Sequence, residues 1–78
     1  MKIEVLGSGC PKCKMLEQRT LEAVKKAGIK ATVEHVYEID KIISMGVFAT
    51  PALAVDGKIV LSGKLPSVDE LVELLRGA

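Results

Sequence analysis

Apolar and polar residues along this chain follow a strand-like pattern in four short segments and helical spacing in three others. The strand-like segments, with alternating or continuous apolar residues, are residues 2–6, 30–36, 52–55 and 58–61. The segments with helical spacing are residues 11–27, 38–45 and 67–76. The predicted order is therefore β-α-β-α-β-β-α. The helix between the first two strands implies a right-handed crossover that leaves those strands parallel.

Local signals mark where several of these elements begin and end. Pro11 fits the first position of a helix, where a missing N–H costs nothing. Ser67 and Glu70 have the spacing of a capping box, and Asp56-Gly57 is typical of a two-residue hairpin turn. On the first helix one face carries the residues expected to pack on the sheet: Cys13, Leu16, Thr20, Ala23, Val24 and Ala27.

Composition narrows the class of protein. The 78 residues indicate a single domain, residues 1–78, and a content of 49% apolar and 27% charged residues is typical of globular proteins. The net charge is +1 without a basic run, so a nucleic-acid partner is not expected. Two cysteines are too few for a secreted disulfide scaffold, and neither a signal peptide nor an apolar stretch of membrane-spanning length is visible. We therefore expect a cytoplasmic monomer without a membrane partner.

The two cysteines of the chain, Cys10 and Cys13, stand between a glycine-containing turn and the first predicted helix. A C-x-x-C pair at the start of a helix is the arrangement for reversible dithiol–disulfide chemistry, because the free N–H groups there favour a thiolate. Helical spacing turns Cys13 toward the core and leaves Cys10 at the exposed tip. A dithiol mechanism needs this combination of an accessible attacking sulfur and a sheltered resolving sulfur. The charge of Lys12 would favour the Cys10 thiolate further, unless Lys12 is simply a solvated helix residue.

Two other classes of function use the same pair of cysteines. A zinc site needs four ligands, and His35, which is most simply a strand residue, is the one candidate for a third. Copper-carrier domains also begin with a strand, a loop, C-x-x-C and a helix. However, they place a Met where this chain has Ser8, and they end in a strand where a capped helix is predicted here. A soft-metal carrier of copper or zinc is thus the main alternative, and an interaction domain without redox activity is a third interpretation.

Three strings carry a resemblance to a known family: Gly-Ser-Gly-Cys-Pro-Lys-Cys at 7–13, Ala-Thr-Pro-Ala-Leu at 49–53 and Val-Asp-Gly-Lys at 55–58. Together with the element order, they resemble the thioredoxin superfamily in its short, glutaredoxin-like form. The likeness is to the small prokaryotic proteins called redox-active disulfide proteins, and it covers essentially the whole chain. It implies an α/β protein with the minimal thioredoxin fold. In that fold a four-stranded mixed sheet carries the first and third helices on one face and the second helix on the other.

The resemblance also implies roles for individual residues. Cys10 would be the nucleophile and Cys13 the resolving cysteine. Pro51 would follow a cis peptide bond and lie against the disulfide, which leaves the backbone of Thr50 free to pair with an extended substrate segment. Pro11 and Lys12, between the two cysteines, are expected to contact the substrate as well.

Four other positions carry expectations that the structure can test. Larger thioredoxins have a Trp directly before the first cysteine, and because this chain has Gly9 we expect a hydrophobic docking contact to be missing. Glu4 stands where larger thioredoxins have a buried proton acceptor for the resolving thiol. Its simpler interpretation is a solvent-facing strand residue that alternates with apolar neighbours. Tyr37 and Phe48 are expected to pack in the core or at its rim.

These observations lead to a functional hypothesis. The chain is expected to be a small dithiol–disulfide oxidoreductase that reduces protein disulfides through Cys10 and Cys13. Its partners would be a disulfide-bearing protein substrate and a reductase that restores the dithiol. No cofactor or metal is expected beyond the redox-active cysteines themselves.

Overall fold

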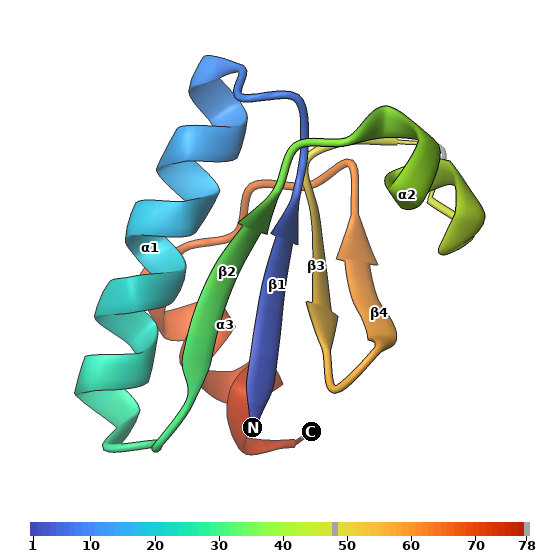
Figure 1. Cartoon of the computed structure of the whole chain (residues 1–78). Helices are drawn as coiled ribbons and strands as arrows, with labels where there is room; N and C mark the ends of the chain where they lie inside the picture. The colour runs from blue at the N-terminus through green and yellow to red at the C-terminus, as the bar shows by residue number, and fades with distance from the viewer. Residues whose placement is uncertain (48, 78) are drawn as a thin grey trace.

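The computed structural model describes residues 1–47 and 49–77, and its elements follow the predicted order (Figure 1). Phe48, for which packing in the core or at its rim was expected, lies outside the described residues. The predicted α/β class is confirmed. The elements are β1 (Lys2–Leu6), α1 (Pro11–Ala27), β2 (Thr32–Val36), α2 (Ile39–Ser44), β3 (Ala52–Val55), β4 (Lys58–Ser62) and α3 (Val68–Arg76).

The four strands form one mixed sheet in the order β2-β1-β3-β4. The pair β1–β2 is parallel, as the crossover through α1 requires, whereas β1–β3 and β3–β4 are antiparallel. The carboxyl ends of β1 and β2 therefore meet at one edge of the sheet, and the chain leaves β1 there to enter α1 (Figure 1). Antiparallel pairing of Leu6 with Ala52 brings the start of β3 to the same edge.

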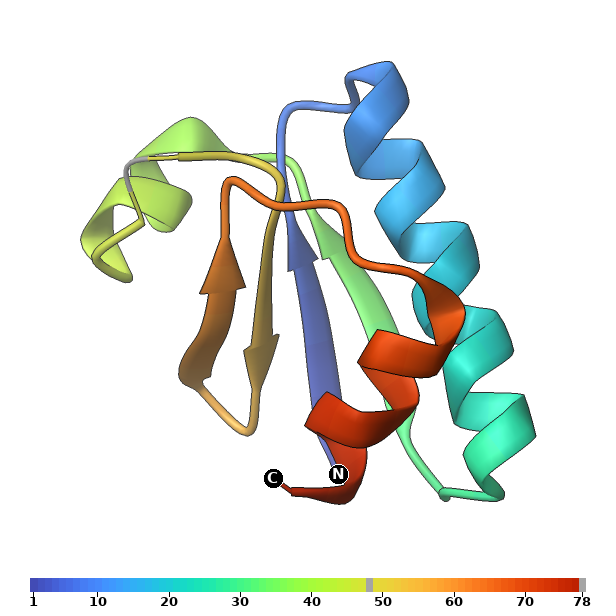
Figure 2. The same cartoon turned by 180° about the vertical axis from the view of Figure 1, so that it is seen from behind.

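Helices cover both faces of the sheet, as predicted (Figures 1 and 2). The face under α1 and α3 holds the larger core cluster, in which Ile3 and Val5 of β1 contact Leu16 of α1 and Leu71 of α3. The opposite face holds a smaller cluster under α2, with Leu6, Val36, Ile42, Val47, Ala52 and Ala54.

Caps account for the bounds of the long helices. Pro11 occupies the first turn of α1, the Cys10 sulfur accepts a bond from the Cys13 amide, and Gly28 ends the helix in the left-handed conformation. In α3 the predicted capping box of Ser67 and Glu70 is present. Among the described residues, no helix is both long enough and apolar enough to cross a membrane.

The bounds of several elements differ slightly from the prediction. β2 begins at Thr32 rather than at residue 30, because the Ile29 amide still bonds to the Val24 carbonyl and pairing with the N-terminal strand starts when the Thr32 amide reaches Met1. α2 is shorter than residues 38–45, and β4 extends to Ser62. Helix ends fray by one or two residues in this way without a change of topology.

Candidate active site

The two cysteines lie at the edge of the sheet where β1 ends, in the loop and first turn of α1 (Figure 1). The Gly7 amide donates to the Val36 carbonyl at 3.0 Å, so β1 stays attached to β2 up to the loop. Gly9 then takes a φ of 89°, in the region that favours glycine, and turns the chain into the helix. The site is therefore built on a rigid strand end and a helix N-terminus.

The two thiols differ in exposure, as the helical spacing predicts. Cys13 is fully buried, whereas Cys10 is partly exposed. Both are free thiols with their Sγ atoms 2.6 Å apart, and the Cys13 amide donates to the Cys10 Sγ at 3.4 Å. A disulfide bond measures about 2.05 Å, so the two sulfurs can be joined with little movement of the backbone.

The environment shifts the two thiol pKa values in opposite directions. The pKa of Cys10 is lowered, first by the hydrogen bond from the Cys13 thiol and then by backbone amides, including those of Cys13 and Lys12. The pKa of Cys13 is raised, chiefly by burial and next by its hydrogen bond with Cys10. Lys12 contributes to this lowering through its backbone amide, and its charged side chain is exposed. A thiolate forms most readily on the accessible sulfur.

Gly7 makes the close approach of Cys13 possible. A Cβ on Gly7 would overlap the Cys13 Sγ and lie 3.0 Å from the Cys13 Cβ. The same position lies 4.0 Å from the Thr50 Cβ, so the strand end, the buried thiol and the segment before β3 meet here. The sequence pattern placed Gly7 in a turn, and no sequence signal showed that it makes room for a sulfur.

The other residues predicted for the site lie in the segment before β3 and in the first turn of α1, near the two thiols. The Thr50–Pro51 peptide bond is cis, which confirms that prediction. Pro51 is buried and its carbonyl accepts a bond from the Gly63 amide at 2.8 Å, while Thr50 is exposed. Pro11 and Lys12, also exposed, lie in the first turn of α1. Their contact with a substrate stays a prediction.

His35 has partners that the sequence did not reveal. Its Nδ1 lies 2.5 Å from the Glu17 Oε1 of α1, and its Nε2 lies 3.2 Å from the Gly7 carbonyl oxygen. Its side chain is 7% exposed and stacks on the Tyr37 ring at a centroid distance of 4.0 Å. Of the two predicted places for Tyr37, core or rim, the structure shows the rim: the ring packs on His35 but is exposed just after β2, beside the loop that carries Cys10.

Glu4 is 5% exposed, so the expectation of a solvent-facing residue is wrong. It lies on central strand β1, paired with Glu34 on one side and Ala54 on the other. Alternation along a strand implies exposure where one face of the sheet is open, whereas Glu4 is buried on a central strand between β2 and β3. A role for Glu4 as proton acceptor stays a prediction.

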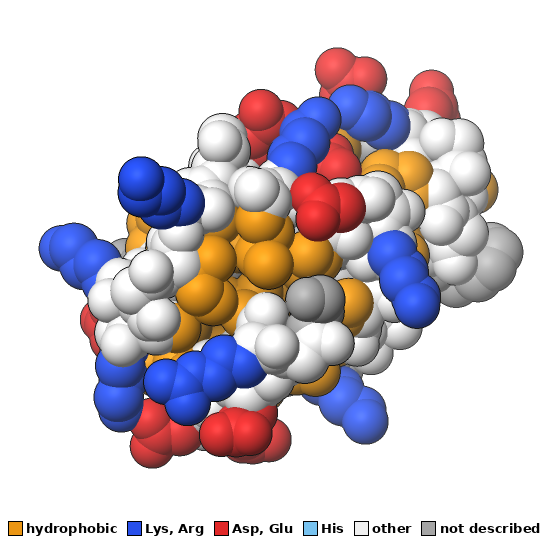
Figure 3. Space-filling view, turned by 90° about the horizontal axis from the view of Figure 1, so that it is seen from below, with side chains coloured by type: hydrophobic (Ala, Val, Ile, Leu, Met, Phe, Trp, Pro, Cys, Tyr) orange, Lys and Arg blue, Asp and Glu red, His pale blue; other side chains and the backbone are white. Residues whose placement is uncertain are grey.

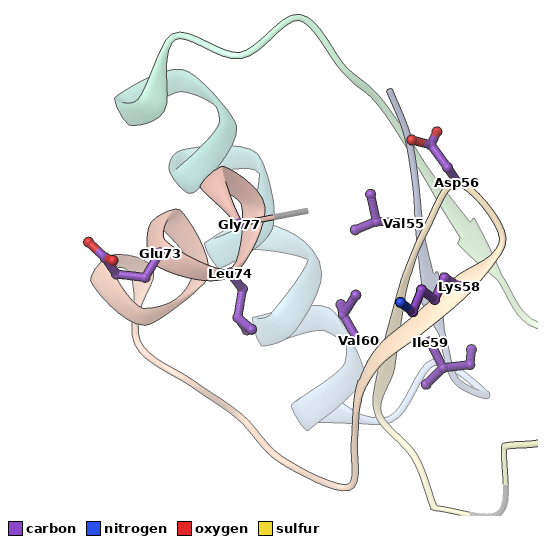
Figure 4. Close-up of a pocket in the computed structure, with 8 residues that line it drawn as sticks. All are labelled: Val55, Asp56, Lys58, Ile59, Val60, Glu73, Leu74 and Gly77. Atoms are coloured by element: carbon purple, nitrogen blue, oxygen red, sulfur yellow. The ribbon is translucent and has the colours of Figure 1, made fainter.

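The surface also has a hollow far from the cysteines. This hollow, of about 730 Å³, opens between the β3–β4 hairpin and α3 at the opposite end of the sheet, lined by Val55, Val60 and Leu74 among others (Figure 4). Figure 3 shows hydrophobic side chains gathered at that end with charged side chains around them. Across residues 1–47 and 49–77, no group of three His, Cys, Asp or Glu side chains is placed to hold a metal ion.

Comparison with known proteins adds independent information. The family model described as "Thioredoxin domain" matches residues 1–76. A thioredoxin of Methanothermobacter thermautotrophicus is 44% identical over 75 residues, which cover 96% of this chain and 97% of that protein. A thioredoxin of Methanocaldococcus jannaschii is 40% identical over 74 residues, which cover 95% of this chain and 85% of that protein.

Proposed function

This chain belongs to the thioredoxin family and is a thiol–disulfide oxidoreductase, and on that premise we propose that it reduces protein disulfides through Cys10 and Cys13. The observation that carries the proposal is the asymmetry of the two thiols. The sulfur that a substrate can reach has a lowered pKa, and the adjacent buried sulfur has a raised one. Nucleophile and resolving thiol are thereby distinguished before any substrate binds.

The reaction proceeds in two exchanges. The Cys10 thiolate attacks one sulfur of the substrate disulfide, an S–S bond forms between them, and the other substrate sulfur leaves as a thiolate that takes a proton. Cys13 then loses its proton and attacks the Cys10 sulfur, so the first substrate sulfur leaves as a second thiolate. Two electrons pass from the dithiol to the substrate, and the chain is left with a Cys10–Cys13 disulfide.

The geometry supports separate roles for the surrounding groups. The hydrogen bond from the Cys13 thiol stabilises the Cys10 thiolate in the resting dithiol. Burial keeps Cys13 protonated until the mixed disulfide removes the negative charge on Cys10. Exposed Thr50, Pro11 and Lys12 lie around the reactive sulfur, where the substrate chain must pass, and buried Pro51 holds the segment that presents Thr50.

The cycle also requires a partner that restores the dithiol. We propose a cellular reductase for this step. No bound cofactor is needed, because electrons enter and leave through the two sulfurs alone. We also propose that the protein is monomeric and cytoplasmic. A soft-metal carrier is not favoured, since the chain ends in the capped helix α3 and matches the thioredoxin family over nearly its whole length.

Trapping of the mixed disulfide tests the proposal. In the Cys13→Ser variant the resolving step is blocked, so a covalent adduct with a protein disulfide such as insulin should accumulate on Cys10 and be visible by mass spectrometry. Wild-type protein should reduce insulin catalytically with dithiothreitol as electron donor, and Cys10→Ser should be inactive. A stable adduct on Cys13 in the Cys10→Ser variant, or insulin reduction by that variant at the wild-type rate, would overturn the assignment.

A further inference from the structure

The exposed ring of Tyr37 lies against the residue that precedes the nucleophile. A Cβ on Gly9 would lie 3.3 Å from the Tyr37 Cε1 and 3.6 Å from its Cδ1. Gly9 has no side chain, so the Tyr37 ring covers the backbone directly before Cys10. Larger thioredoxins have a Trp at this position, and here an aromatic group from another part of the chain lies beside it. Tyr37 is 57% exposed and available to a bound molecule.

The His35 ring holds the Tyr37 ring in place. It stacks on the His35 ring with a centroid distance of 4.0 Å and an interplanar angle of 2°. His35 is itself fixed at both nitrogens, by the Glu17 carboxylate and by the Gly7 carbonyl. An aromatic side chain that is already ordered loses little conformational entropy when a partner binds on it, which makes it an efficient contact.

The chain runs from Tyr37 into α2, which also exposes apolar side chains. Ile39 and Ile43 of this helix are 59% and 52% exposed. Both side chains line a hollow of about 270 Å³. Its lining also includes Ser8 and Thr50, next to the redox site, and the buried Ile42 and Val47. Exposed apolar surface that adjoins a reactive group is typical of a binding surface rather than of ordinary solvent-facing residues.

We propose that Tyr37 is a specificity-determining residue of this enzyme, and that its preferred substrates are protein disulfides with apolar residues beside the reacting cysteine. The inference rests on the proposed function. Attack brings the substrate sulfur to bonding distance of Cys10, and successive Cα atoms are about 3.8 Å apart, so the residues flanking the substrate cysteine must cross this neighbourhood. The Tyr37 ring lies beside the backbone before Cys10, and the hollow reaches the same region through Ser8 and Thr50.

The test compares two synthetic peptides, each with one cysteine in a mixed disulfide with 2-nitro-5-thiobenzoate. Leucine and valine flank the cysteine in one, and glycine and serine flank it in the other. Attack by Cys10 releases the coloured thiolate, so the second-order rate constant is read optically. Tyr37→Ala should slow the apolar peptide by about tenfold and the polar peptide by less than about twofold, the range expected for one apolar contact.

Two matched variants serve as controls. Tyr37→Phe keeps the ring and should stay within about twofold of wild type on both peptides, because the hydroxyl is not required for apolar contact. Leu21→Ala removes a comparable exposed apolar side chain about two helical turns beyond Cys13, and it should leave both rates unchanged.

Several outcomes would overturn the proposal. If Tyr37→Ala lowers the rate constants of both peptides equally, Tyr37 acts on Cys10 rather than on the substrate. If it lowers neither rate constant, Tyr37 does not contribute to substrate binding. A Tyr37-dependent dimer in size-exclusion chromatography would identify a second copy as the occupant of this surface.

Failure of the proposed function gives a different result. In that case wild-type protein would release no thiolate from either peptide. The specificity proposal is then decided by NMR, using peptides in which serine replaces the cysteine. Shifts of the Tyr37 ring signals with the apolar peptide alone would support it, and unchanged ring signals with both peptides would overturn it.

Discussion

The two faces of the sheet differ in how they are covered. On one face α1 and α3 pack over β1 and β3 with the larger group of fully buried side chains, among them Leu16, Leu71 and Leu75. On the other face the six-residue helix α2 buries Ile42 and leaves Ile39 and Ile43 exposed. The comparison indicates that folding stability comes mainly from the first face, while the second is left available for binding.

Capping shows the same difference. α3 begins with a capping box, in which Ser67 and Glu70 each satisfy a backbone amide of the other. In the described part of the chain, Glu38 makes no side-chain capping bond at the start of α2. A helix of six residues is unstable alone, so α2 depends on its few tertiary contacts. The hollow next to Ser8 and Thr50 is therefore lined by the less strongly supported helix, whereas Tyr37 is held by His35.

The largest expected effect is on the face under α3. Leu71→Ala should lower the free energy of unfolding by about 2–5 kcal/mol, because it leaves a cavity in a fully buried cluster. Ile43→Ala, on exposed α2, should change it by less than about 0.5 kcal/mol. Chemical denaturation followed by circular dichroism measures both. Similar losses for the two variants would contradict the assignment of stability to one face.

A second variant tests the close contact between Gly7, at the end of β1, and the buried Cys13. Gly7→Ala should lower the free energy of unfolding by about 1–3 kcal/mol, because the new methyl group overlaps the Cys13 sulfur. It should also raise the pKa of Cys10 toward its ordinary value, since displacement of Cys13 weakens the hydrogen bond that lowers it most. Denaturation and the pH dependence of iodoacetamide alkylation provide the measurements. A stable variant with an unchanged Cys10 profile would show that the contact is unimportant.

A smaller effect is expected at the helix cap. Ser67→Ala should lower the free energy of unfolding by about 1 kcal/mol through loss of the bond to the Glu70 amide. Rates on the two peptide disulfides should not change, because α3 packs on the face away from α2. Ser67→Asp, which keeps a cap acceptor, is the matched control and should retain most of the stability. A slower reaction of Ser67→Ala with either peptide would contradict the prediction that the face under α3 contributes to stability and not to the reaction.

The most localised effect concerns the pH dependence of the two thiols. Cys10 has a lowered pKa in the folded protein, so its contribution to stability is present above the unfolded pKa and is lost as pH falls through the folded pKa. Cys13 has a raised pKa, so its contribution is present below the unfolded pKa and is lost as pH rises through the folded pKa. Alkylation of the reduced protein should therefore begin at Cys10 on the acid side of the ordinary thiol pKa, about 8.5.

Variants separate the causes of these shifts. Cys13→Ala should raise the pKa of Cys10, because it removes the thiol hydrogen bond, and Cys13→Ser should raise it less, because a hydroxyl can still donate. Lys12→Gln keeps the backbone amide and should leave the alkylation profile of Cys10 unchanged. A clear upward shift in Lys12→Gln would show that the charged side chain acts on the thiolate after all.

Much of the architecture was predictable because its signals are local. The Pro11 start, the Ser67 capping box and the hairpin turn at 56–57 depend on a few neighbouring residues, and all three lie where expected. The opposite exposure of Cys10 and Cys13 follows from helical periodicity once one face of α1 is buried. These features could be read from the chain because backbone geometry and side-chain period are properties of short segments.

Other features of the site depend on segments that are distant in the sequence. Glu17 meets His35 through the crossover of α1, and Tyr37 reaches Gly9 because β1 and β2 end at the same edge of the sheet. Glu4 is buried on a central strand whose neighbours, β2 and β3, come from distant parts of the chain. The sequence by itself determined the element order, the redox pair and the exposure of its two sulfurs. The tertiary structure decided which side chains surround that pair, because packing between distant segments leaves no periodic pattern in either one.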